Sequence, residues 1–294
     1  MEKFFDRVNH DRLMWLLGTR IGDKGLLRLI HRFLRSGMLS SGIVSQRIQG
    51  TPQGSPLSPL LSNIVLDELD KELSRRGHRF VRYADDLIIL VRSRKASERV
   101  SASIISFIEE VMLLKVNKTK SRICRPYALN FLGYSILNDG SLGLSKSSEL
   151  RFKSKIKHLT QRNRGISMAQ LICEVNRLLR GWLNYFKLAR MRKRLQGLSS
   201  WLRHRLRCFR LKQCKRAIGI FRFLVKRGIV DWQAWLLALS RKGWYRKSSC
   251  PQAHQAMNQK GFDEIGLFNL EHNYCYQFKG TAVYVSTHSG VRGR

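Results

Sequence analysis

Positive charge is concentrated in one part of this 294-residue chain, and this limits how the chain can fold and what it can bind. Residues 151–250 contain 27 lysines and arginines but only two acidic residues, Glu174 and Asp231. Residues 1–150 are more balanced, with 24 basic and 15 acidic side chains, and the whole chain has a formal charge of +35. Self-repulsion of this size is costly without a polyanion, so we expect the chain to bind nucleic acid, mainly through residues 151–250. A generic basic protein, or one that binds an anionic membrane surface, is the alternative.

The spacing of apolar residues predicts two regions of different architecture. Before about residue 146, short apolar runs alternate with helical patterns, which favours an α+β fold with an antiparallel sheet and helices on one face. After it, apolar residues recur at helical spacing, as at Met168, Leu171, Ile172, Val175, Leu178, Leu179, Trp182 and Leu183. We predict an α+β domain over 1–146, a basic all-α domain over 147–250, and a C-terminal extension and tail over 251–294.

Capping and turn residues predict where individual elements begin and end. The expected elements of the first domain are a strand that ends at Phe4-Phe5, a helix over 26–34 that ends at Ser36-Gly37, a helix to about Leu73 with Ser58 as its N-cap, a helix along 100–111, and a strand over 130–136.

The strongest chemical signal is the pair Asp85 and Asp86. The two aspartates follow Tyr83 and Ala84 at a tight turn between two apolar runs within residues 80–91, which predicts a β-hairpin. Such a turn holds neighbouring carboxylates in place, and Mg²⁺ binds carboxylates together with substrate phosphates. Two aspartates in a turn are, on their own, more often solvated turn residues. The apolar strands on both sides favour the metal site, because a solvated turn does not need them.

Three weaker motifs accompany this pair. In residues 52–54, Gly54 lets backbone approach a ligand closely, and Gln53 offers both a donor and an acceptor to a nucleotide. Phe5 belongs to the sequence Phe-Phe-Asp at 4–6, and Lys120 ends the sequence Asn-Lys-Thr-Lys at 117–120. Taken singly, these motifs fit a stiff loop, a core aromatic pair and a solvated basic turn.

Together and in this order, the four motifs resemble the palm of reverse transcriptases. Their detailed sequence is similar to group II intron maturases, above all GTPQGSPLSPLLSN at 50–63 and RFVRYADD at 79–86. In the second half, RGWLNYF at 180–186 resembles the maturase-specific thumb, residues 205–216 resemble its basic helix, and SRKGWYR at 240–246 fits its last segment. The resemblance covers roughly residues 1–270 and is to the bacterial class without an endonuclease domain.

The resemblance implies an RNA-directed DNA polymerase and intron RNA maturase, with a partial reverse transcriptase palm followed by an all-α thumb/maturase domain. It implies that Asp85 and Asp86 hold Mg²⁺ at a two-metal site, and that Lys120 protonates or neutralises the leaving pyrophosphate. Substrate contacts are implied for Phe5, which would exclude a ribose 2′-hydroxyl, and for Gln53, Gly54 and Tyr83. The implied partners are intron RNA, an RNA template with a DNA primer, and deoxynucleotides. The basic residues expected to contact RNA are Arg180, Arg203, Arg205, Arg207, Arg210, Lys212, Lys215 and Arg216.

The resemblance also implies segments that this chain lacks. The family has a fingers region before the first motif and an aspartate just ahead of Phe-Phe-Asp, whereas this chain begins at Met1. We therefore expect a truncated chain that polymerises poorly alone, one carboxylate ligand short, with a separate N-terminal fragment as a possible partner. A wrongly assigned start codon, an RNA-binding splicing cofactor without polymerase activity, and a retron or defence-type reverse transcriptase are the alternatives.

Cysteine spacing and apolar run lengths bear on the compartment. The six cysteines form no Cys-x-x-Cys pair, so free thiols in a reducing compartment are expected. The first residues lack the apolar segment of a signal peptide, and no apolar run is long enough to span a membrane. We expect a bacterial cytoplasmic protein that associates with nucleic acid and not with a membrane.

Overall fold

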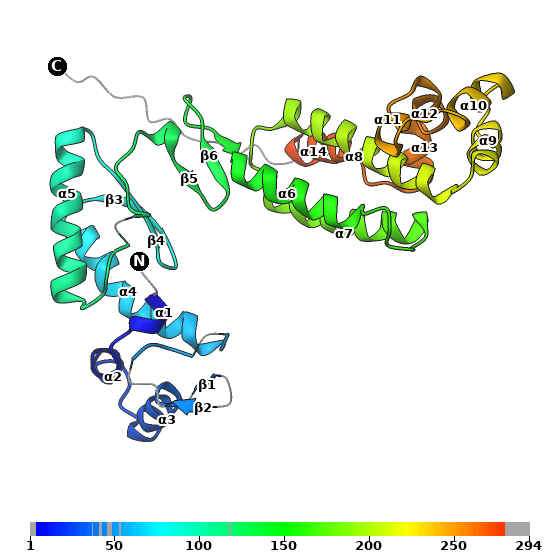
Figure 1. Ribbon diagram of the computed structural model, residues 1–294. Coiled ribbons are helices and arrows are strands. Elements are labelled where there is room, and N and C mark those ends of the chain that lie inside the picture. Colours follow the sequence, from blue (N-terminus) through cyan, green and yellow to red (C-terminus); the bar gives the residue numbers. More distant parts are fainter. Residues whose placement is uncertain are drawn as a thin grey trace, which may run out of the picture. The chain divides into compact units, whose positions relative to one another are not determined.

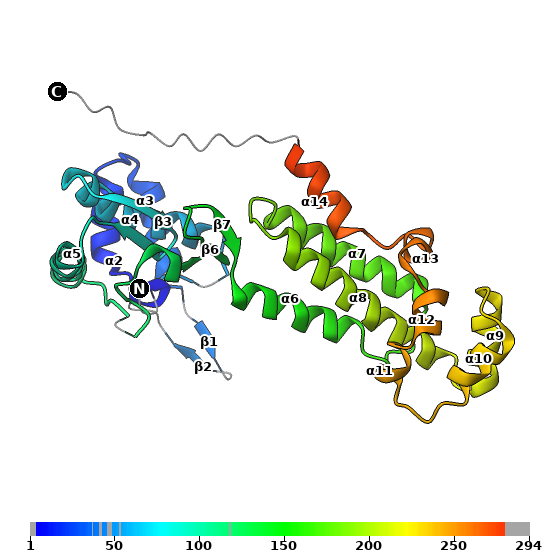
Figure 2. The same cartoon turned by 90° about the horizontal axis from the view of Figure 1, so that it is seen from above.

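The chain divides into two compact units in the computed structural model (Figures 1 and 2). The units are Met1–Cys124 and Arg125–Arg294, and the residues that the structure describes are 4–36, 38–40, 43–45, 49–52, 54–117 and 119–279. The predicted α+β class is confirmed, because helices predominate and the small sheets are all antiparallel. The boundary near residue 146 stays a prediction, and the two compact units meet earlier, after Cys124.

The first unit consists of helices and two small hairpins. Its elements are α1 (Phe4–Arg7), α2 (His10–Gly18), α3 (Lys24–Leu34), β1 (Met38–Ser40), β2 (Ile43–Ser45), α4 (Leu57–Arg75), β3 (Arg79–Tyr83), β4 (Asp86–Leu90), α5 (Arg94–Ser106) and the π-helical turn η1 (Phe107–Val111). Strand β1 pairs with β2 and β3 pairs with β4, both antiparallel.

One face of the β3–β4 hairpin is covered by helices, as the sequence predicts. Phe80, Leu87 and Ile89 point to this face and pack against a core that includes residues of α2, α3, α4 and α5. The opposite face is open, and Val81 and Tyr83 are more than half exposed there. The helices therefore hold the hairpin from one side and leave the other side accessible.

The second unit is mainly helical. Its elements are η2 (Pro126–Ala128), β5 (Asn130–Phe131), β6 (Tyr134–Ile136), β7 (Leu142–Leu144), α6 (Lys146–Leu159), α7 (Met168–Tyr185), α8 (Arg192–Gln213), α9 (Ala217–Lys226), α10 (Asp231–Ala238), α11 (Trp244–Lys247), α12 (Pro251–Ala256), α13 (Gln259–Glu264) and α14 (Leu270–Lys279).

A single apolar core holds these helices together. The predicted stripe of α7 contributes Leu171, Val175, Leu179 and Leu183, all fully buried. Helices α6 and α7 run alongside each other in Figures 1 and 2. Residues of α12, α13 and α14 join the same core, so the predicted C-terminal extension is part of this packed unit up to at least Tyr274.

Two predictions near the start of the chain are wrong. Phe4 and Phe5 lie in the short helix α1 and not at a strand end. Two adjacent aromatic residues carry no periodicity, so they cannot separate a strand from a helical turn. Ser58 is inside α4 and is not its N-cap. Its hydroxyl donates to the carbonyl of Pro52, while the Ser55 hydroxyl accepts a hydrogen bond from the Leu57 amide.

Two further boundaries differ from the expected ones. Helix α3 ends at Leu34 with Arg35 as its C-cap, and Gly37 lies outside the described residues. Residues 130–136 form a tight hairpin, β5 and β6, where one strand was expected. Leu132 and Gly133 turn this hairpin with φ of 50° and 83°. A leucine rarely adopts a positive φ, so an apolar run hid the turn.

Two expectations about composition agree with the described residues. The described cysteines Cys124, Cys173, Cys208, Cys214 and Cys250 are all free thiols. Within the described parts of the chain, no helix combines the length and apolar character needed to cross a membrane.

Candidate active site and nucleic-acid interface

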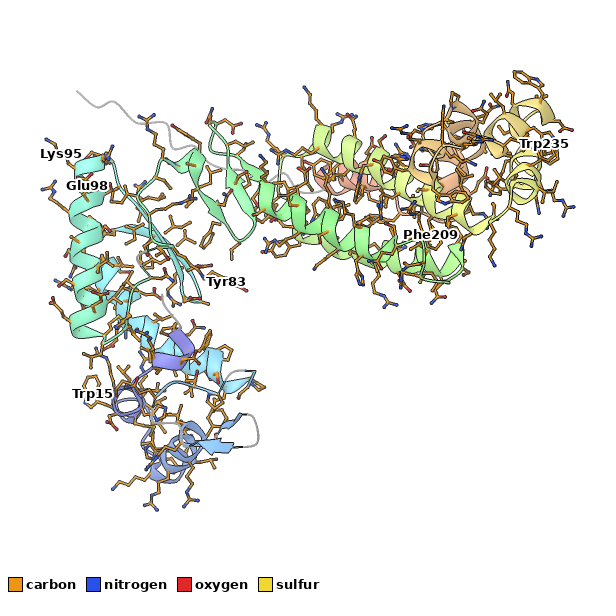
Figure 3. The ribbon with its side chains drawn as sticks, in the orientation of Figure 1. Trp15, Tyr83, Lys95, Glu98, Phe209 and Trp235 are labelled. Carbon is orange, nitrogen blue, oxygen red and sulfur yellow. The ribbon has the colours of Figure 1, made fainter. Side chains whose placement is uncertain are left out.

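The β3–β4 hairpin presents Asp85 and Asp86 at its turn. The strands are in the register that pairs Tyr83 with Asp86, so Ala84 and Asp85 are the two turn residues. Ala84 has a φ of 50°, a left-handed conformation that costs an ordinary residue on the order of 1 kcal/mol. Tyr83 is 63% exposed and lies at the turn end of the hairpin (Figure 3). The turn thus carries two adjacent carboxylates beside an accessible aromatic ring.

Arg82 clamps this turn to helix α4. Its Nε donates to Asp70 Oδ1 at 2.7 Å, and its Nη2 pairs with the other oxygen of the same carboxylate. Its Nη1 donates to Asn63 Oδ1 and to the carbonyl oxygen of Ala84, each at 3.0 Å. A bidentate pair combined with a bond to the turn carbonyl fixes both position and orientation. Arg82 belongs to the motif at 79–86, but the motif alone gives no indication of this clamp.

Hydrogen bonds join the Phe-Phe-Asp motif at 4–6 to the loop that begins at Gly50. The backbone amide of Thr51 donates to the carbonyl of Phe5 at 2.6 Å, and the amide of Gly50 donates to the carbonyl of Val8 at 2.8 Å. Gly50 has a φ of 84°, and a side chain there would lie 2.6 Å from the Phe5 carbonyl oxygen. Only glycine fits this approach. The loop that leads to residues 52–54 is therefore built directly on α1, next to Phe5.

The remaining predicted substrate residues are placed as follows. Gly54 has a φ of 85°, a conformation that favours glycine, and a Cβ atom added there would meet no other atom within 4 Å. Gln53 lies outside the described residues. Lys120 is exposed in a turn that Asn117 holds, because the Asn117 side chain accepts hydrogen bonds from the Lys120 and Thr119 amides.

The hairpin supplies two carboxylates to a possible metal site. Among the described residues, no group of three or more histidine, cysteine, aspartate or glutamate side chains is close enough to hold a metal ion. Two carboxylates on a fixed turn still suit Mg²⁺, which in nucleotide enzymes binds one or two carboxylates together with substrate phosphates. The residues present therefore fit Mg²⁺ as an ion shared with a substrate.

Helix α8 carries eight lysines and arginines and no acidic residue. Several of these cations lie against aromatic rings: Arg210 is 4.8 Å from the Phe223 ring centre and Lys212 is 5.3 Å from the Trp244 ring centre. Arg180, on α7, lies 5.6 Å from the Phe268 ring centre. Such contacts orient the cations without neutralising their charge.

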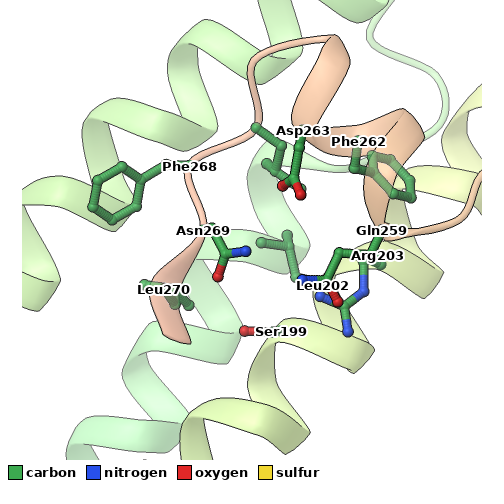
Figure 4. A pocket seen from close by; sticks show the side chains of 10 residues that line it. Ser199, Leu202, Arg203, Gln259, Phe262, Asp263, Phe268, Asn269 and Leu270 are labelled. Carbon is green, nitrogen blue, oxygen red and sulfur yellow. The ribbon is translucent and has the colours of Figure 1, made fainter. Parts of the chain in front are cut away.

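The eight predicted RNA-contacting residues differ in exposure. Arg180, Lys212, Lys215 and Arg216 are exposed, and Lys215 has a φ of 55° in the turn after α8. Arg203 is half-buried beside a small cavity of about 10 Å³, together with Ser199, Asp263 and Asn269 (Figure 4). This cavity has room for one water molecule at most.

Arg207 is packed inside the second unit. It is only 5% exposed, its Nε donates to the carbonyl of Met257 at 2.9 Å, and its guanidinium lies 5.7 Å from the Phe262 ring centre. Burial, and secondarily the nearby Arg203 cation, lower the pKa of Arg207 to about 10. Contact of Arg207 with RNA stays a prediction, but the geometry supports a role in joining α8 to α12 and α13.

Comparison with known proteins supports both halves of this description. Residues 1–136 match the reverse transcriptase (RNA-dependent DNA polymerase) family, and residues 150–227 match the maturase-specific domain of group II introns. The two matches together cover most of the chain. The chain belongs to the group II intron-encoded reverse transcriptase and maturase family. Reverse transcriptases generally use Mg²⁺.

Individual relatives agree with the family. Over 212 residues the chain is 26% identical to "Protein YkfC" of Escherichia coli, an alignment that covers 60% of this chain and 54% of the relative. Over 221 residues it is 26% identical to "Group II intron-encoded protein LtrA" of Lactococcus lactis, covering 53% of this chain and 36% of the relative. The chain thus spans about half the length, or less, of the curated relatives it matches.

The retron alternative is the weaker one. The "Retron Ec86 reverse transcriptase" of Escherichia coli is 28% identical over 112 residues, which is 37% of this chain and 35% of the relative. A match to the maturase-specific domain over residues 150–227 accounts for a segment beyond the polymerase motifs. The second unit therefore separates the group II intron family from the retron one.

Proposed function

We propose that this chain contributes template-directed deoxynucleotidyl transfer and intron RNA binding to a group II intron-encoded protein. The observation that carries the polymerase part is the pair Asp85 and Asp86 on a hairpin turn that Arg82 clamps to α4. A rigidly placed carboxylate pair is what positional catalysis of phosphoryl transfer needs. The substrates are an RNA template, a DNA primer and deoxynucleotides.

In the proposed reaction, the primer 3′-hydroxyl loses its proton to water and its oxygen bonds to the α-phosphorus of a deoxynucleotide, while the bond from that phosphorus to pyrophosphate breaks. Asp85 and Asp86 would hold Mg²⁺, which would supply positive charge to stabilise the attacking and leaving oxygens. Lys120 supplies positive charge or a proton to the leaving pyrophosphate. Phe5 excludes a ribose 2′-hydroxyl.

Three more residues complete the proposed nucleotide site. Gln53 contacts the incoming nucleotide, Gly54 allows the backbone to approach it closely, and Tyr83 lines the site beside the two aspartates. The half-exposed surface of the hairpin and the open space around Gly54 support these assignments.

The maturase part of the proposal rests on the second unit. Several of its exposed cations, namely Arg180, Lys215 and Arg216, have no acidic partner among the described residues, whereas others such as Arg190 do. Phosphates of a structured RNA are the natural counterions for such a surface. We propose that this surface binds the intron RNA and assists its splicing.

The test of the polymerase part is primer extension on an RNA template with Mg²⁺, measured with the chain joined to an N-terminal segment that carries the aspartate expected just ahead of Phe-Phe-Asp at 4–6. Replacing Asp85 by asparagine should reduce extension by about a hundredfold or more, because the loss of a metal ligand removes several kcal/mol of transition-state stabilisation. Affinity for RNA should not change. Asp67→Asn is the matched control, because Asp67 is a carboxylate on α4 that pairs with Arg20 and Lys71.

The same experiment separates the second candidate, an RNA-binding splicing cofactor without polymerase activity. This candidate is favoured by the cationic surface of the second unit, which does not depend on the hairpin. Undiminished extension by Asp85→Asn would remove the hairpin from the active site. If the wild-type chain extends no primer, and both it and the Asp85→Asn variant still assist splicing, then the cofactor role is established instead.

A further inference from the structure

A large cavity opens between three segments of the second unit. It has a volume of about 580 Å³ and is lined by Gln161, Arg162 and Asn163 from the loop after α6, Arg205 and Lys212 from α8, and Trp244 from α11. This volume is within the range of roughly 300–1,000 Å³ typical of sites that take small molecules. Three of the six lining residues are cations and none is acidic. The chemistry of the lining therefore selects an anion that also carries a flat or apolar group.

Arg205 is held rigidly at one wall of this cavity. Its Nε donates to Thr160 Oγ1 at 2.9 Å, and its Nη2 donates to the carbonyls of Lys157 and Thr160 at 3.2 and 3.3 Å. These bonds satisfy the last carbonyls of α6, and within the described residues Nη1 makes no hydrogen bond. Burial lowers the pKa of Arg205, and the neighbouring Arg162 cation lowers it too. Arg162 and Arg205 line the same cavity, and no carboxylate is among its lining residues.

Trp244 supplies an aromatic surface to the same cavity. It is half-buried and packs against the main core of the second unit. Lys247, which is buried and donates from Nζ to the carbonyl of Ala238, lies 5.5 Å from its ring centre. Lys212 lies 5.3 Å from the same ring centre but is exposed. A ligand can therefore displace Lys212 from the ring, whereas Lys247 is fixed in place.

We propose that this cavity binds one unpaired nucleotide of the bound RNA. Its base lies against Trp244, its phosphate is held by Arg162, Arg205 and the displaced Lys212, and the side-chain amides of Gln161 and Asn163 face the edge of the base. Stacking of unpaired bases on aromatic side chains is the usual way in which proteins recognise non-helical RNA. The proposal rests on the proposed RNA-binding function and adds to it a preference for RNA with an unpaired nucleotide.

The experiment compares two RNA hairpins with the same stem, one fully paired and one with a single bulged 2-aminopurine. Dissociation constants of the full chain are measured at one salt concentration. The wild-type chain should bind the bulged hairpin about tenfold more tightly, the effect of stacking one base on an aromatic side chain. Trp244→Leu should abolish this preference and the quenching of 2-aminopurine, whereas Trp244→Phe should keep most of the preference because phenylalanine can still stack on the base.

Two matched controls test the site itself. Trp232→Leu removes a tryptophan that is 66% exposed on α10 and should leave the preference unchanged. Arg162→Gln should weaken binding of the bulged hairpin more than that of the paired hairpin, whereas Lys226→Gln, at an exposed lysine of α9, should weaken both equally. Because Arg162 is exposed, its replacement does not depend on the packing of Trp244.

The outcomes separate this proposal from the proposed function. Equal binding of both hairpins by the wild-type chain, or a preference that survives in Trp244→Leu and Arg162→Gln, would overturn the nucleotide site while RNA binding stands. If the wild-type chain binds neither hairpin, then the proposed RNA-binding function itself is contradicted.

Discussion

The two units of the chain treat their positive charges differently. In the first unit, buried or half-buried arginines pair with carboxylates, as Arg12 does with Glu68 and Arg82 does with Asp70. In the second unit, Arg205 and Arg207 bond to backbone carbonyls or a hydroxyl. Carboxylates cancel charge, whereas carbonyls and rings orient a cation and leave its charge in place. The second unit also has ion pairs, such as Arg164–Glu174 and Arg190–Asp139. Its cations greatly outnumber its carboxylates, however, so most of its positive charge stays available for a polyanion.

Replacing exposed cations of the two units tests this comparison most strongly. Exchanging Arg180, Lys212, Lys215 and Arg216 for glutamine should lower affinity for a structured RNA by about a hundredfold. The slope of the logarithm of affinity against the logarithm of salt concentration should become shallower, by the amount expected for the loss of about three phosphate contacts. The same change at Arg28, Arg35, Lys95 and Arg99, all exposed in the first unit, should have a much smaller effect. Filter binding over a range of salt concentrations gives both quantities. Equal losses in the two variants would contradict the comparison.

Arg207 tests whether a cation of the second unit can be structural. Replacing it with methionine should destabilise the chain by about 2–3 kcal/mol. A charged hydrogen bond is lost, and the carbonyl of the buried Met257 is left unsatisfied. Thermal denaturation should then show a midpoint lower by about 4–10 °C. Arg216→Met, at an exposed position, should change the midpoint little. An Arg207→Met variant of normal stability and weakened RNA binding would assign Arg207 to the interface instead.

Arg82 tests whether an ion pair of the first unit holds the structure around the two aspartates. Arg82→Lys keeps the charge but loses the bidentate pair with Asp70 and the simultaneous bond to the Ala84 carbonyl. We expect primer extension to fall about tenfold, since a loosened turn misplaces the carboxylates, while RNA affinity stays the same. Arg75→Lys, whose arginine pairs with Glu72 at the end of α4, is the control. A loss of RNA affinity without a loss of extension would show that Arg82 does not act through the turn.

Acid should affect the two units in different pH ranges, with small effects. Burial, and then the cations Arg207, His204 and Arg203, lower the pKa of His254 below 6.5. The unfolded chain therefore binds this proton more readily, so the second unit loses stability as pH falls through 6.5 and below. In the first unit, Arg75 and Arg76 lower the pKa of Glu72 to about 2, and its contribution is lost only as pH falls from 4.5 towards 2.

NMR titration of the histidine signals tests the first of these ranges. The signal absent from a His254→Gln variant should titrate below pH 6.5, and that variant should lose less thermal stability between pH 7 and 5 than the wild-type chain. A His254 pKa at or above 6.5 would contradict the prediction.

Most of the family assignment was readable from the sequence because its signals are local. A hairpin needs only apolar strands and a turn, so the hairpin that carries Asp85 and Asp86 was predicted correctly. The stripe of α7 was readable because helical spacing repeats along the chain. The hairpin turn at Leu132 was missed, because its positive φ is set by the packing around Gly133 and not by the residue type.

Only the tertiary structure decided which cationic side chains are exposed to a ligand and which are buried in the protein. Helix α8 carries cations over most of its surface outside one apolar stripe, so its sequence does not separate the buried Arg207 from the exposed Lys212. Its contacts with residues some fifty positions along the chain make that distinction, as the bond from Arg207 to Met257 shows. The same holds for the Arg82 clamp and for the cavity at Trp244, whose walls are far apart in sequence. Local patterns determined the motifs, whereas contacts between distant segments determined the surroundings that give each motif its charge, exposure and orientation.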